Sequence, residues 1–248
     1  MEYGLIGKTL VHSYSKIIHG LIGAYSYELI SLSPEELDGF MQEKNFRGIN
    51  VTIPYKKDVI PYCSEITDRA RKIGSVNTIV NRNGCLLGHN TDYDGFAAMA
   101  EGAGISFAGN KVLILGSGGT MLTASAVATD MGAAEVTVVS RKGPVTYDCL
   151  PDYYHYDIIV NTTPVGMFPE TEKCPLDIRP FTNLQGVLDA IYNPTETKLV
   201  KMARDCGIPA SNGLYMLVVQ AIKAAELFFD KSFPDNLGER IMAELRLP

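Results

Sequence analysis

Residues 111–120 read KVLILGSGGT, and this stretch decides the fold of the chain. Its first five residues form an apolar run typical of a buried strand, and the glycines that follow permit a sharp turn. Residues 120–132 then have the pattern of a helix. A strand, a glycine-rich turn and a helix in this order are typical of dinucleotide-binding folds, because free N–H groups at the helix start bind a pyrophosphate. An ordinary tight turn is the alternative, since Met121 occupies the third glycine position of the GxGxxG pattern.

Apolar runs alternate with helical patterns along the rest of the chain, which predicts an α/β fold. Ser33–Glu36 has the features of an N-cap, a first-turn proline and a capping-box glutamate, so a helix is expected there. Residues 141–156 leave little room for a full crossover helix. Further helices are expected from near Asp92, Gly119 and Thr195 and over Gly213–Phe229 and Leu237–Leu245. The expected strands are Glu2–Ile6, Tyr25–Leu32, Gly48–Ile53, Val76–Asn81, Lys111–Leu115, Glu135–Ser140, Asp157–Asn161 and Gly186–Ala190.

A stretch rich in glycine and other small residues at 101–110 marks the boundary between two predicted domains. Residues 102–213 are expected to form a Rossmann-like nucleotide-binding domain. The last two helices have no further strand to cross over to in that sheet, so we expect them to return to the first domain. Residues 1–101 and 214–248 would therefore form an α/β domain that binds the substrate and carries the catalytic groups.

The chain has 248 residues, of which 46% are hydrophobic and 20% charged, as in globular proteins with a substantial core. Its net charge of −6 and its lack of a long basic stretch argue against nucleic-acid binding. No apolar run approaches the roughly 18 residues of a membrane helix, and residues 1–8 lack the features of a signal peptide. Five widely spaced cysteines favour reduced thiols and a cytoplasmic location. The four histidines lack metal-binding spacing, so no metal is expected.

Lys56 in GINVTIPYK (48–56) and Asp92 in GHNTDYDG (88–95) form a candidate acid–base pair. Lys56 follows Pro54 and is expected in the first turn of a short helix, where the helix dipole acts on its charge. If the two side chains are in contact, they titrate as a coupled pair that can hold and pass one proton. The spacing alone fits equally well a solvated lysine and an aspartate that caps the following helix.

Other polar residues could bind a small hydroxylated acid and a phosphorylated cofactor. Ser13 and Ser15 offer hydroxyl groups that can hold a carboxylate without adding charge. Ser140, Arg141 and Lys142 follow the second strand of the nucleotide domain, where an acidic residue would favour NAD. Two cations and a hydroxyl suit a 2′-phosphate and therefore NADP, with a solvated basic turn as the alternative. The polar residues beside strands, which suit either turns or ligand contacts, are Thr52, Asn77 and Asn90.

A series of motifs along nearly the whole chain resembles the shikimate dehydrogenase family. In order, they are HSYSKIIH, GINVTIPYK, IGSVNTIV, GHNTDYDG, LGSGGT, SRK, IIVNTTPVGM, DAIYNPTETKL and NGLYMLVVQA. GxNVTxPxK together with GxNTDxxG is highly specific for this family. The resemblance implies reversible reduction of 3-dehydroshikimate by NADPH to shikimate, in the biosynthesis of chorismate and the aromatic amino acids. It also implies that Lys56 is the catalytic acid–base group and Asp92 its partner.

The resemblance further implies which residues bind the substrate and the cofactor. The implied substrate-binding residues are Ser13, Ser15, Thr52, Asn77, Asp92, Tyr192 and Gln220. The implied NADP-binding residues are Asp68, Gly116, Ser117, Gly118, Gly119, Thr120, Ser140, Arg141, Lys142, Thr162, Ala190 and Gly213.

Several residues depart from the family pattern. Lys16 and Gly20 replace the proline and asparagine of HSxSPxxHN, at the wall of the implied substrate pocket. Ser140 stands where asparagine is common, at the implied adenosine contact. Two alternatives stay open: a quinate/shikimate dehydrogenase with broader substrate or NAD use, and a non-catalytic NADP-binding regulator on the same scaffold. A small molecule is the expected partner, and the protein is expected to be a monomer or a homodimer.

Overall fold

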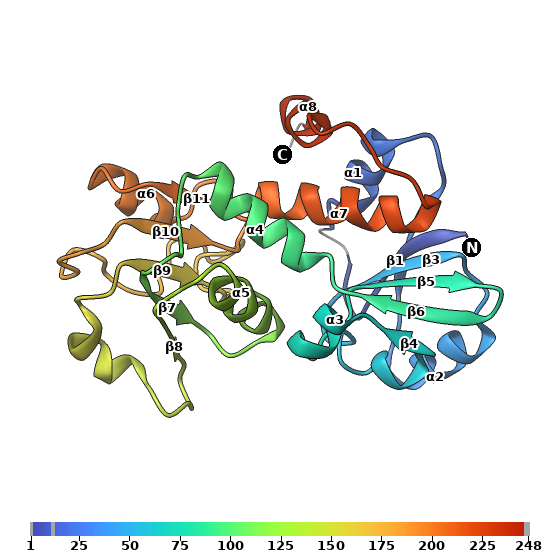
Figure 1. The fold of residues 1–248 in the computed structure, drawn as a ribbon, viewed down its shortest axis with the longest axis horizontal. Helices are drawn as coiled ribbons and strands as arrows, with labels where there is room; N and C mark the ends of the chain where they lie inside the picture. Colours follow the sequence, from blue (N-terminus) through green and yellow to red (C-terminus); the bar gives the residue numbers. More distant parts are fainter. Residues whose placement is uncertain (1, 11–12, 246–248) are drawn as a thin grey trace. The chain divides into compact units, whose positions relative to one another are not determined.

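The computed structural model describes residues 2–10 and 13–245, and it divides into two compact units. One unit comprises the chain up to Asp92 together with the chain from Val218, and the other comprises Tyr93–Leu217. Each unit combines a sheet with helices, so the predicted α/β class is confirmed (Figure 1). The chain passes between the units at 92/93 and 217/218, whereas the sequence predicted domain limits at 101/102 and 213/214. The differences arise because one helix at each passage contributes residues to both units.

A mixed sheet forms the centre of the first unit, in the order β2-β1-β3-β5-β6-β4. Its strands are β1 (Tyr3–Gly7), β2 (Tyr27–Ser31), β3 (Gly48–Val51), β4 (Glu65–Ile66), β5 (Thr78–Arg82) and β6 (Cys85–His89). β1 pairs in parallel with both β2 and β3. The hairpin of β5 and β6 joins antiparallel to β3, which brings the segments before β5 and after β6 close to the end of β3.

Helices and apolar clusters bury both faces of this sheet. Successive strand residues point to opposite faces, so Leu5 and Ile6 of β1 belong to two different clusters. The Ser33 cap and the Glu36 capping box begin α2 as predicted, and the Ser33 N–H donates to Glu36 Oε2 at 2.7 Å. The helical elements that contribute to this unit are α1 (Ser15–Ile22), α2 (Pro34–Glu43), η1 (Ile60–Tyr62), α3 (Asp68–Ile73), the start of α4 (Asp92–Gly102), most of α7 (Leu214–Phe229) and α8 (Leu237–Glu244).

Gly48 in β3 leaves room for the ring of Phe228 in α7. A Cβ atom at this position would lie 2.3 Å from Phe228 Cδ1 and 2.7 Å from Cε1, and the ring is buried. Gly48→Ala should therefore lower the free energy of unfolding by about 1–3 kcal/mol, because the ring must move inside a packed core. Gly39→Ala, on the exposed side of α2 with open space around it, should raise that free energy by about 0.5–1 kcal/mol. Urea unfolding measures both changes, and unchanged stability in Gly48→Ala would contradict the first.

The second unit contains a parallel sheet in the order β11-β10-β9-β7-β8. Its strands are β7 (Lys111–Leu115), β8 (Glu135–Val139), β9 (Ile158–Asn161), β10 (Gly186–Asp189) and β11 (Ala210–Ser211). The first of these strands in the chain, β7, pairs with β8 on one side and β9 on the other. The strand order thus reverses between β7 and β9, and in doubly wound folds ligands bind at the carboxyl ends of the strands beside such a reversal.

The connections of this sheet follow the predicted pattern. Helix α5 (Gly119–Asp130) begins directly after the glycine-rich turn, and α6 (Lys198–Asp205) is capped by Thr197. Between β8 and β9 the chain forms only a 3₁₀ segment, η2 (Tyr147–Tyr153). The sequence therefore predicted correctly that no full crossover helix fits there.

Other sequence predictions differ from the structure. Three strands, β4, β6 and β11, were not predicted. Residues 53–59 form turns, so the prediction that Lys56 lies in the first turn of a short helix is wrong. The helical segments η1 and α3 were not predicted either, and the remaining differences are small shifts in the ends of strands and helices.

Within residues 2–10 and 13–245, no helix is both long and apolar enough to cross a bilayer. In the same residues, His, Cys, Asp and Glu side chains form no group of three placed to hold a metal ion. The cysteines are free thiols, and only Cys206 is exposed.

Candidate active site

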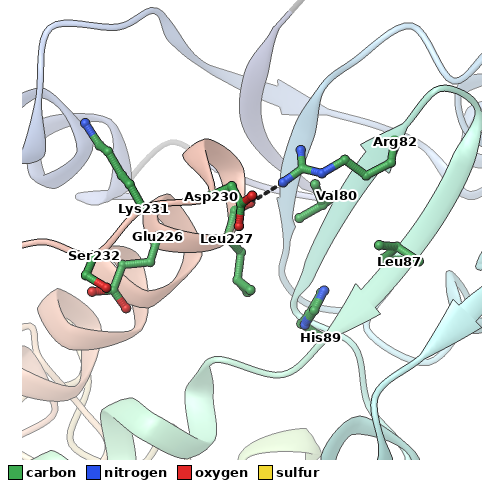
Figure 2. A pocket seen from close by; sticks show the side chains of 9 residues that line it. All are labelled: Val80, Arg82, Leu87, His89, Glu226, Leu227, Asp230, Lys231 and Ser232. Carbon is green, nitrogen blue, oxygen red and sulfur yellow. Dashed lines mark hydrogen bonds between the residues drawn. The ribbon is translucent and has the colours of Figure 1, made fainter.

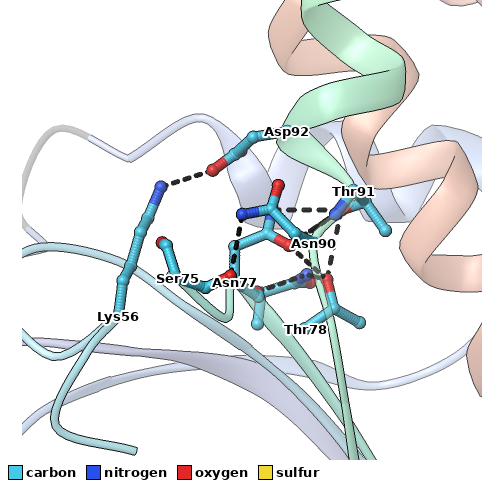
Figure 3. Close-up of polar contacts among 8 residues, drawn as sticks. Lys56, Ser75, Asn77, Thr78, Asn90, Thr91 and Asp92 are labelled. Atoms are coloured by element: carbon cyan, nitrogen blue, oxygen red, sulfur yellow. Dashed lines mark hydrogen bonds and ion pairs between the residues drawn. The ribbon is translucent and has the colours of Figure 1, made fainter. Parts of the chain in front are cut away.

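Lys56 and Asp92 form an ion pair in the first unit (Figure 3). Lys56 Nζ lies 2.6 Å from Asp92 Oδ2, and the two side chains are only 18% and 12% exposed. Such an arrangement rules out a fully solvated lysine at position 56. A nearly buried ammonium–carboxylate pair with one edge open to solvent can hold and pass one proton, which is the chemistry of general acid–base catalysis.

The turn that carries Lys56 is fixed to its surroundings by backbone hydrogen bonds. The Lys56 carbonyl accepts from the Val76 N–H at 2.8 Å, and the Thr52 carbonyl accepts from the Tyr55 N–H at 3.0 Å. The Tyr55 side chain is buried, and its hydroxyl donates to the Leu32 carbonyl at 2.5 Å. These contacts hold the backbone on both sides of Lys56, so little conformational freedom remains to be lost when the ammonium acts on a ligand.

Asp92 begins α4, and a buried polar network fixes the residue before it (Figure 3). Asn77 Oδ1 accepts from the Thr91 N–H at 2.7 Å, and Asn77 Nδ2 donates to Thr91 Oγ1 at 3.0 Å. The Thr78 hydroxyl lies 3.1 Å from the Thr91 hydroxyl. Within the described residues Asn77 Nδ2 makes one hydrogen bond, so its second hydrogen is available to a ligand hydroxyl group.

This network continues into the core of the first unit. Asn50 Nδ2 donates to Thr78 Oγ1 at 2.9 Å, and Asn50 Oδ1 accepts from the Tyr27 hydroxyl at 2.7 Å. His19 stacks on Tyr27 with 3.7 Å between ring centroids, and its Nδ1 lies 2.5 Å from the Tyr25 hydroxyl. Burial lowers the pKa of His19 to about 3, so the imidazole is neutral at any physiological pH. Sequence reasoning did not identify His19, Asn50 or Thr91 as part of the site.

The other predicted substrate residues are divided between the units. Ser15 is the buried first residue of α1, and its N–H donates to the Ser13 hydroxyl at 3.3 Å. Thr52 directly follows β3, and Gln220 is buried in α7. These four residues and Asn77 share a unit with the ion pair, whereas Tyr192 belongs to the second unit.

The glycine-rich turn lies at the reversal of strand order in the second unit. Gly116 has a φ of +104°, and a Cβ atom there would lie 2.9 Å from Thr162 Oγ1. The Thr162 hydroxyl donates to the Leu115 carbonyl at 2.6 Å, which joins the ends of β7 and β9. Gly118 caps α5, and Ser117 and Gly118 are exposed. Gly116, Ser117, Gly118, Gly119 and Thr120 thus surround the start of a helix, where backbone N–H groups favour a phosphate.

The basic segment after β8 is a tight turn. Ser140 is buried, and its N–H donates to the Val145 carbonyl at 3.1 Å. A Cβ atom at Gly143 would lie 2.5 Å from Ser140 Oγ, so only glycine fits there without a shift. Arg141 and Lys142 are exposed on this turn and can bind a phosphate group.

Three further residues predicted to bind the cofactor, Ala190, Gly213 and Asp68, also have structural roles. The Gly213 N–H donates to the Ile191 carbonyl at 2.9 Å, and a Cβ atom there would lie 2.2 Å from the Ala190 carbonyl oxygen. Glycine is therefore required at position 213 by backbone packing against Ala190. Asp68 is an exposed residue in the first turn of α3, where a carboxylate stabilises the helix, and it belongs to the first unit.

Asp189 is a buried carboxylate that the sequence analysis missed. Its Oδ1 accepts from Asn161 Nδ2 at 3.0 Å and from the Ile191 N–H at 3.1 Å. Its Oδ2 accepts from the Thr197 hydroxyl at 2.7 Å. Burial raises the pKa of Asp189 to about 6, against the lowering effect of these hydrogen bonds. A charged residue at the end of an otherwise apolar strand was the available signal in the sequence.

His19 and Asp189 should change the stability of the two units in opposite directions as pH falls. The folded pKa of His19, about 3, lies below its reference value of 6.5, so the stability it contributes is lost as pH falls below 6.5. The folded pKa of Asp189, about 6, lies above its reference value of 3.8, so it adds stability as pH falls through 6. Between pH 7 and pH 5, we expect the first unit to lose about 2 kcal/mol and the second to gain about 1 kcal/mol from these groups.

Hydrogen exchange resolved by peptide, and corrected for intrinsic rates, measures these changes. The loss of stability of the first unit at low pH should be largely absent in His19→Gln. The gain of stability of the second unit should be largely absent in Asp189→Asn. If each variant keeps the pH response of the native protein, other groups control the stability of these units.

A hollow of about 460 Å³ lies between β5, β6 and the end of α7 (Figure 2). Arg82 Nη2 donates to the Leu227 carbonyl at 2.9 Å, Glu226 pairs with Lys223 at 2.8 Å, and the Lys231 ammonium lies 4.7 Å from the Phe233 ring centroid. These charged groups are already engaged within the protein, so we assign no ligand to this hollow. The residues that line it are Val80, Arg82, Leu87, His89, Glu226, Leu227, Asp230, Lys231 and Ser232.

Residues 5–79 match a family model described as the shikimate dehydrogenase substrate binding domain. The shikimate dehydrogenase (NADP(+)) of Clostridium beijerinckii is 36% identical over 96% of this chain and 95% of its own length.

Solved structures agree with this comparison. Shikimate dehydrogenase 1 from Peptoclostridium difficile has a TM-score of 0.90 and 35% identity, covering 100% of this chain and 98% of that one. The Thermus thermophilus shikimate 5-dehydrogenase, in complex with NADP(H) and shikimate, has a TM-score of 0.87 and 27% identity. The match covers 99% of this chain and 100% of that one. A Corynebacterium glutamicum quinate dehydrogenase in complex with NAD has a TM-score of 0.85 and 27% identity, and the match covers 98% of this chain and 99% of that one. Identity above one third over nearly the full length shows that the chain belongs to the shikimate dehydrogenase family.

Proposed function

We propose that this protein catalyses the reversible reduction of 3-dehydroshikimate by NADPH to shikimate, in chorismate and aromatic amino-acid biosynthesis. The observation that carries the proposal is the ion pair of Lys56 and Asp92, 2.6 Å apart and mostly buried, at the motifs specific to the family. The family relationship supplies the substrate and the cofactor, and the pair supplies the proton transfer that this reaction requires.

Lys56 is the acid–base group in this proposal. In the reducing direction Lys56 Nζ donates a proton to the carbonyl oxygen of the substrate, and in the reverse direction it takes that proton back. The cofactor supplies or accepts the hydride. Asp92 accepts a hydrogen bond from the ammonium, which orients it and stabilises its charged form between proton transfers.

The substrate is held by neutral polar groups and the cofactor by the second unit. Ser13 and Ser15 bind the substrate carboxylate, and the second Nδ2 hydrogen of Asn77 binds a ring hydroxyl. Thr52, Gln220 and Tyr192 are the other residues proposed to bind the substrate. Arg141, Lys142 and Ser140 bind the 2′-phosphate. Gly116, Ser117, Gly118, Gly119 and Thr120 would hold the pyrophosphate, and the residues proposed for the nicotinamide are Thr162, Ala190, Gly213 and Asp68.

Four initial rates test the proposal: shikimate and quinate, each with NADP⁺ and with NAD⁺. Shikimate with NADP⁺ should give the highest kcat/KM, at least tenfold above any other combination. Similar rates with quinate or with NAD⁺ would favour the broader quinate/shikimate enzyme, which the likeness to a quinate dehydrogenase keeps as an alternative. Tight NADPH binding without turnover of either substrate would favour a non-catalytic regulator.

The same proposal includes the organisation of the protein. Residues 1–101 and 214–248 form the substrate-binding catalytic domain, and residues 102–213 the NADP-binding domain. The protein acts in the cytoplasm, as its unpaired cysteines suggest, without nucleic acid or membrane partners and as a monomer or homodimer. Light scattering during gel filtration distinguishes the two oligomeric states.

A further inference from the structure

We infer that the buried carboxylate of Asp189 sets the relative affinity of the protein for the two redox forms of its cofactor. The inference rests on the proposed function, because it assumes that NADP(H) binds to the second unit. In this role Asp189 touches no ligand and acts through its charge.

The first observation is that no cation within residues 2–10 and 13–245 forms an ion pair with Asp189. Its three hydrogen-bond donors, Asn161, Ile191 and Thr197, are all neutral, and the side chain is fully buried. Among the described residues, no lysine, arginine or histidine pairs with it. Buried charges in proteins are normally paired or neutralised, and an unpaired one is a candidate for function.

The second observation is its position in the fold. Asp189 ends β10 and lies opposite Asn161, the last residue of β9, which in turn lies opposite Leu115 at the end of β7. The carboxylate therefore belongs to the edge of the sheet at which doubly wound folds bind ligands.

The third observation links the carboxylate to the backbone of that edge. Ile191 donates to Asp189 through its N–H and accepts from the Gly213 N–H through its carbonyl. A Cβ atom at Gly213 would collide with the Ala190 carbonyl, so glycine lets the backbone at 213 pack directly against the residue that follows Asp189. Asn161, bound to Asp189, also accepts from the Thr163 hydroxyl at 2.7 Å and directly precedes Thr162.

The two redox forms of the cofactor differ in the charge of the nicotinamide ring. The nicotinamide ring carries a positive charge in NADP⁺ and none in NADPH. A fixed anion in a poorly solvated region attracts the cationic ring and has little effect on the neutral one, so it favours NADP⁺. The same attraction stabilises the positive charge that develops on the ring as hydride leaves it.

Asp189→Asn tests the inference because it removes the charge and can keep the contacts. The new amide oxygen can accept from Asn161 and Ile191 as Oδ1 does, and its NH₂ can donate to the Thr197 hydroxyl. At pH 8, above the pKa of about 6, the native side chain is ionised. The native protein is titrated with NADPH by following its fluorescence, and NADP⁺ is then measured by competition.

We expect the ratio of the Kd for NADP⁺ to the Kd for NADPH to rise about tenfold in Asp189→Asn. For a two-electron couple this corresponds to a shift of about 30 mV in the potential of the bound cofactor. Thr197→Val keeps the carboxylate charge and removes one donor, so it should change both dissociation constants together and leave their ratio within about twofold. Asp205→Asn removes an exposed charge at the end of α6 and should also leave the ratio unchanged.

The outcomes separate the inference from the function on which it rests. If the native protein binds neither NADPH nor NADP⁺, the proposed function fails. If the native protein binds both and Asp189→Asn leaves the ratio unchanged, Asp189 is a structural residue and the inference is wrong. A change of the ratio in Thr197→Val as large as in Asp189→Asn would also overturn it, because geometry and not charge would then be responsible.

Discussion

Lys56→Met should lower kcat for shikimate oxidation by about 10²- to 10⁴-fold and leave the Kd for NADPH within about twofold. General acid–base groups contribute factors of this size, and methionine keeps the length of the side chain without a proton to transfer. Steady-state rates with shikimate and NADP⁺, together with NADPH fluorescence titration, measure the two quantities. Lys57→Met is the matched control, because Lys57 is the exposed neighbour in the same turn and should keep near-native activity.

The loss of the ammonium also leaves Asp92 without its partner in a mostly buried position. Removing one partner of such a pair is destabilising, so a fall in activity could reflect partial unfolding. Lys56→Met combined with Asp92→Asn removes both charges and avoids the unpaired carboxylate. The double variant should recover thermal stability but not turnover. Activity of Lys56→Met within tenfold of the native rate, in folded protein, would remove Lys56 from the mechanism.

Local signals in the sequence were sufficient for much of the fold. The run KVLIL followed by glycines predicted β7, its turn and α5, because strand burial, glycine conformations and helix spacing all act within a few residues. The Ser33–Glu36 capping box predicted the start of α2 for the same reason. A local signal for β6 was present but not used: Asn83-Gly84, both with positive φ, is a typical hairpin turn between β5 and β6.

Features that depend on distant contacts could not be read from the sequence. The two-residue strands β4 and β11 exist only by pairing with β6 and β10, and such short segments have no periodicity of their own. The contact of Lys56 with Asp92 depends on how the β5–β6 hairpin places the start of α4 beside the end of β3. Spacing along the chain left a solvated lysine and a helix cap open, and only the folded geometry removes the first.

Buried polar residues were the least predictable part of the site. His19 and Asn50 lie within apolar patterns, and their role in a hydrogen-bonded core appears only when Tyr27 and Thr78 are placed beside them. Each polar group in this core takes its partners from several distant segments, so the composition of the network is decided by the whole fold and not by one segment.

Arg141→Ala should raise KM for NADP⁺ by about 10- to 100-fold and leave KM for NAD⁺ within about twofold. A guanidinium can bind a phosphate through paired charge-assisted hydrogen bonds, and only NADP⁺ carries the 2′-phosphate that Arg141 is proposed to bind. The exposure of Arg141 on the tight turn after β8 makes it accessible to that group. Because the contact is electrostatic and partly solvated, the preference of the native protein for NADP⁺ should weaken as salt concentration rises.

Initial rates at fixed shikimate with varied NADP⁺ or NAD⁺ give both KM values. Lys201→Ala, which removes an exposed cation on α6 in the same unit, should change neither value by more than about twofold. The comparison between the two cofactors carries the test, because the cofactors differ only in the 2′-phosphate. If Arg141→Ala weakens NADP⁺ and NAD⁺ equally, Arg141 acts on the adenosine that both share, and the selectivity for NADP must come from Ser140 and Lys142.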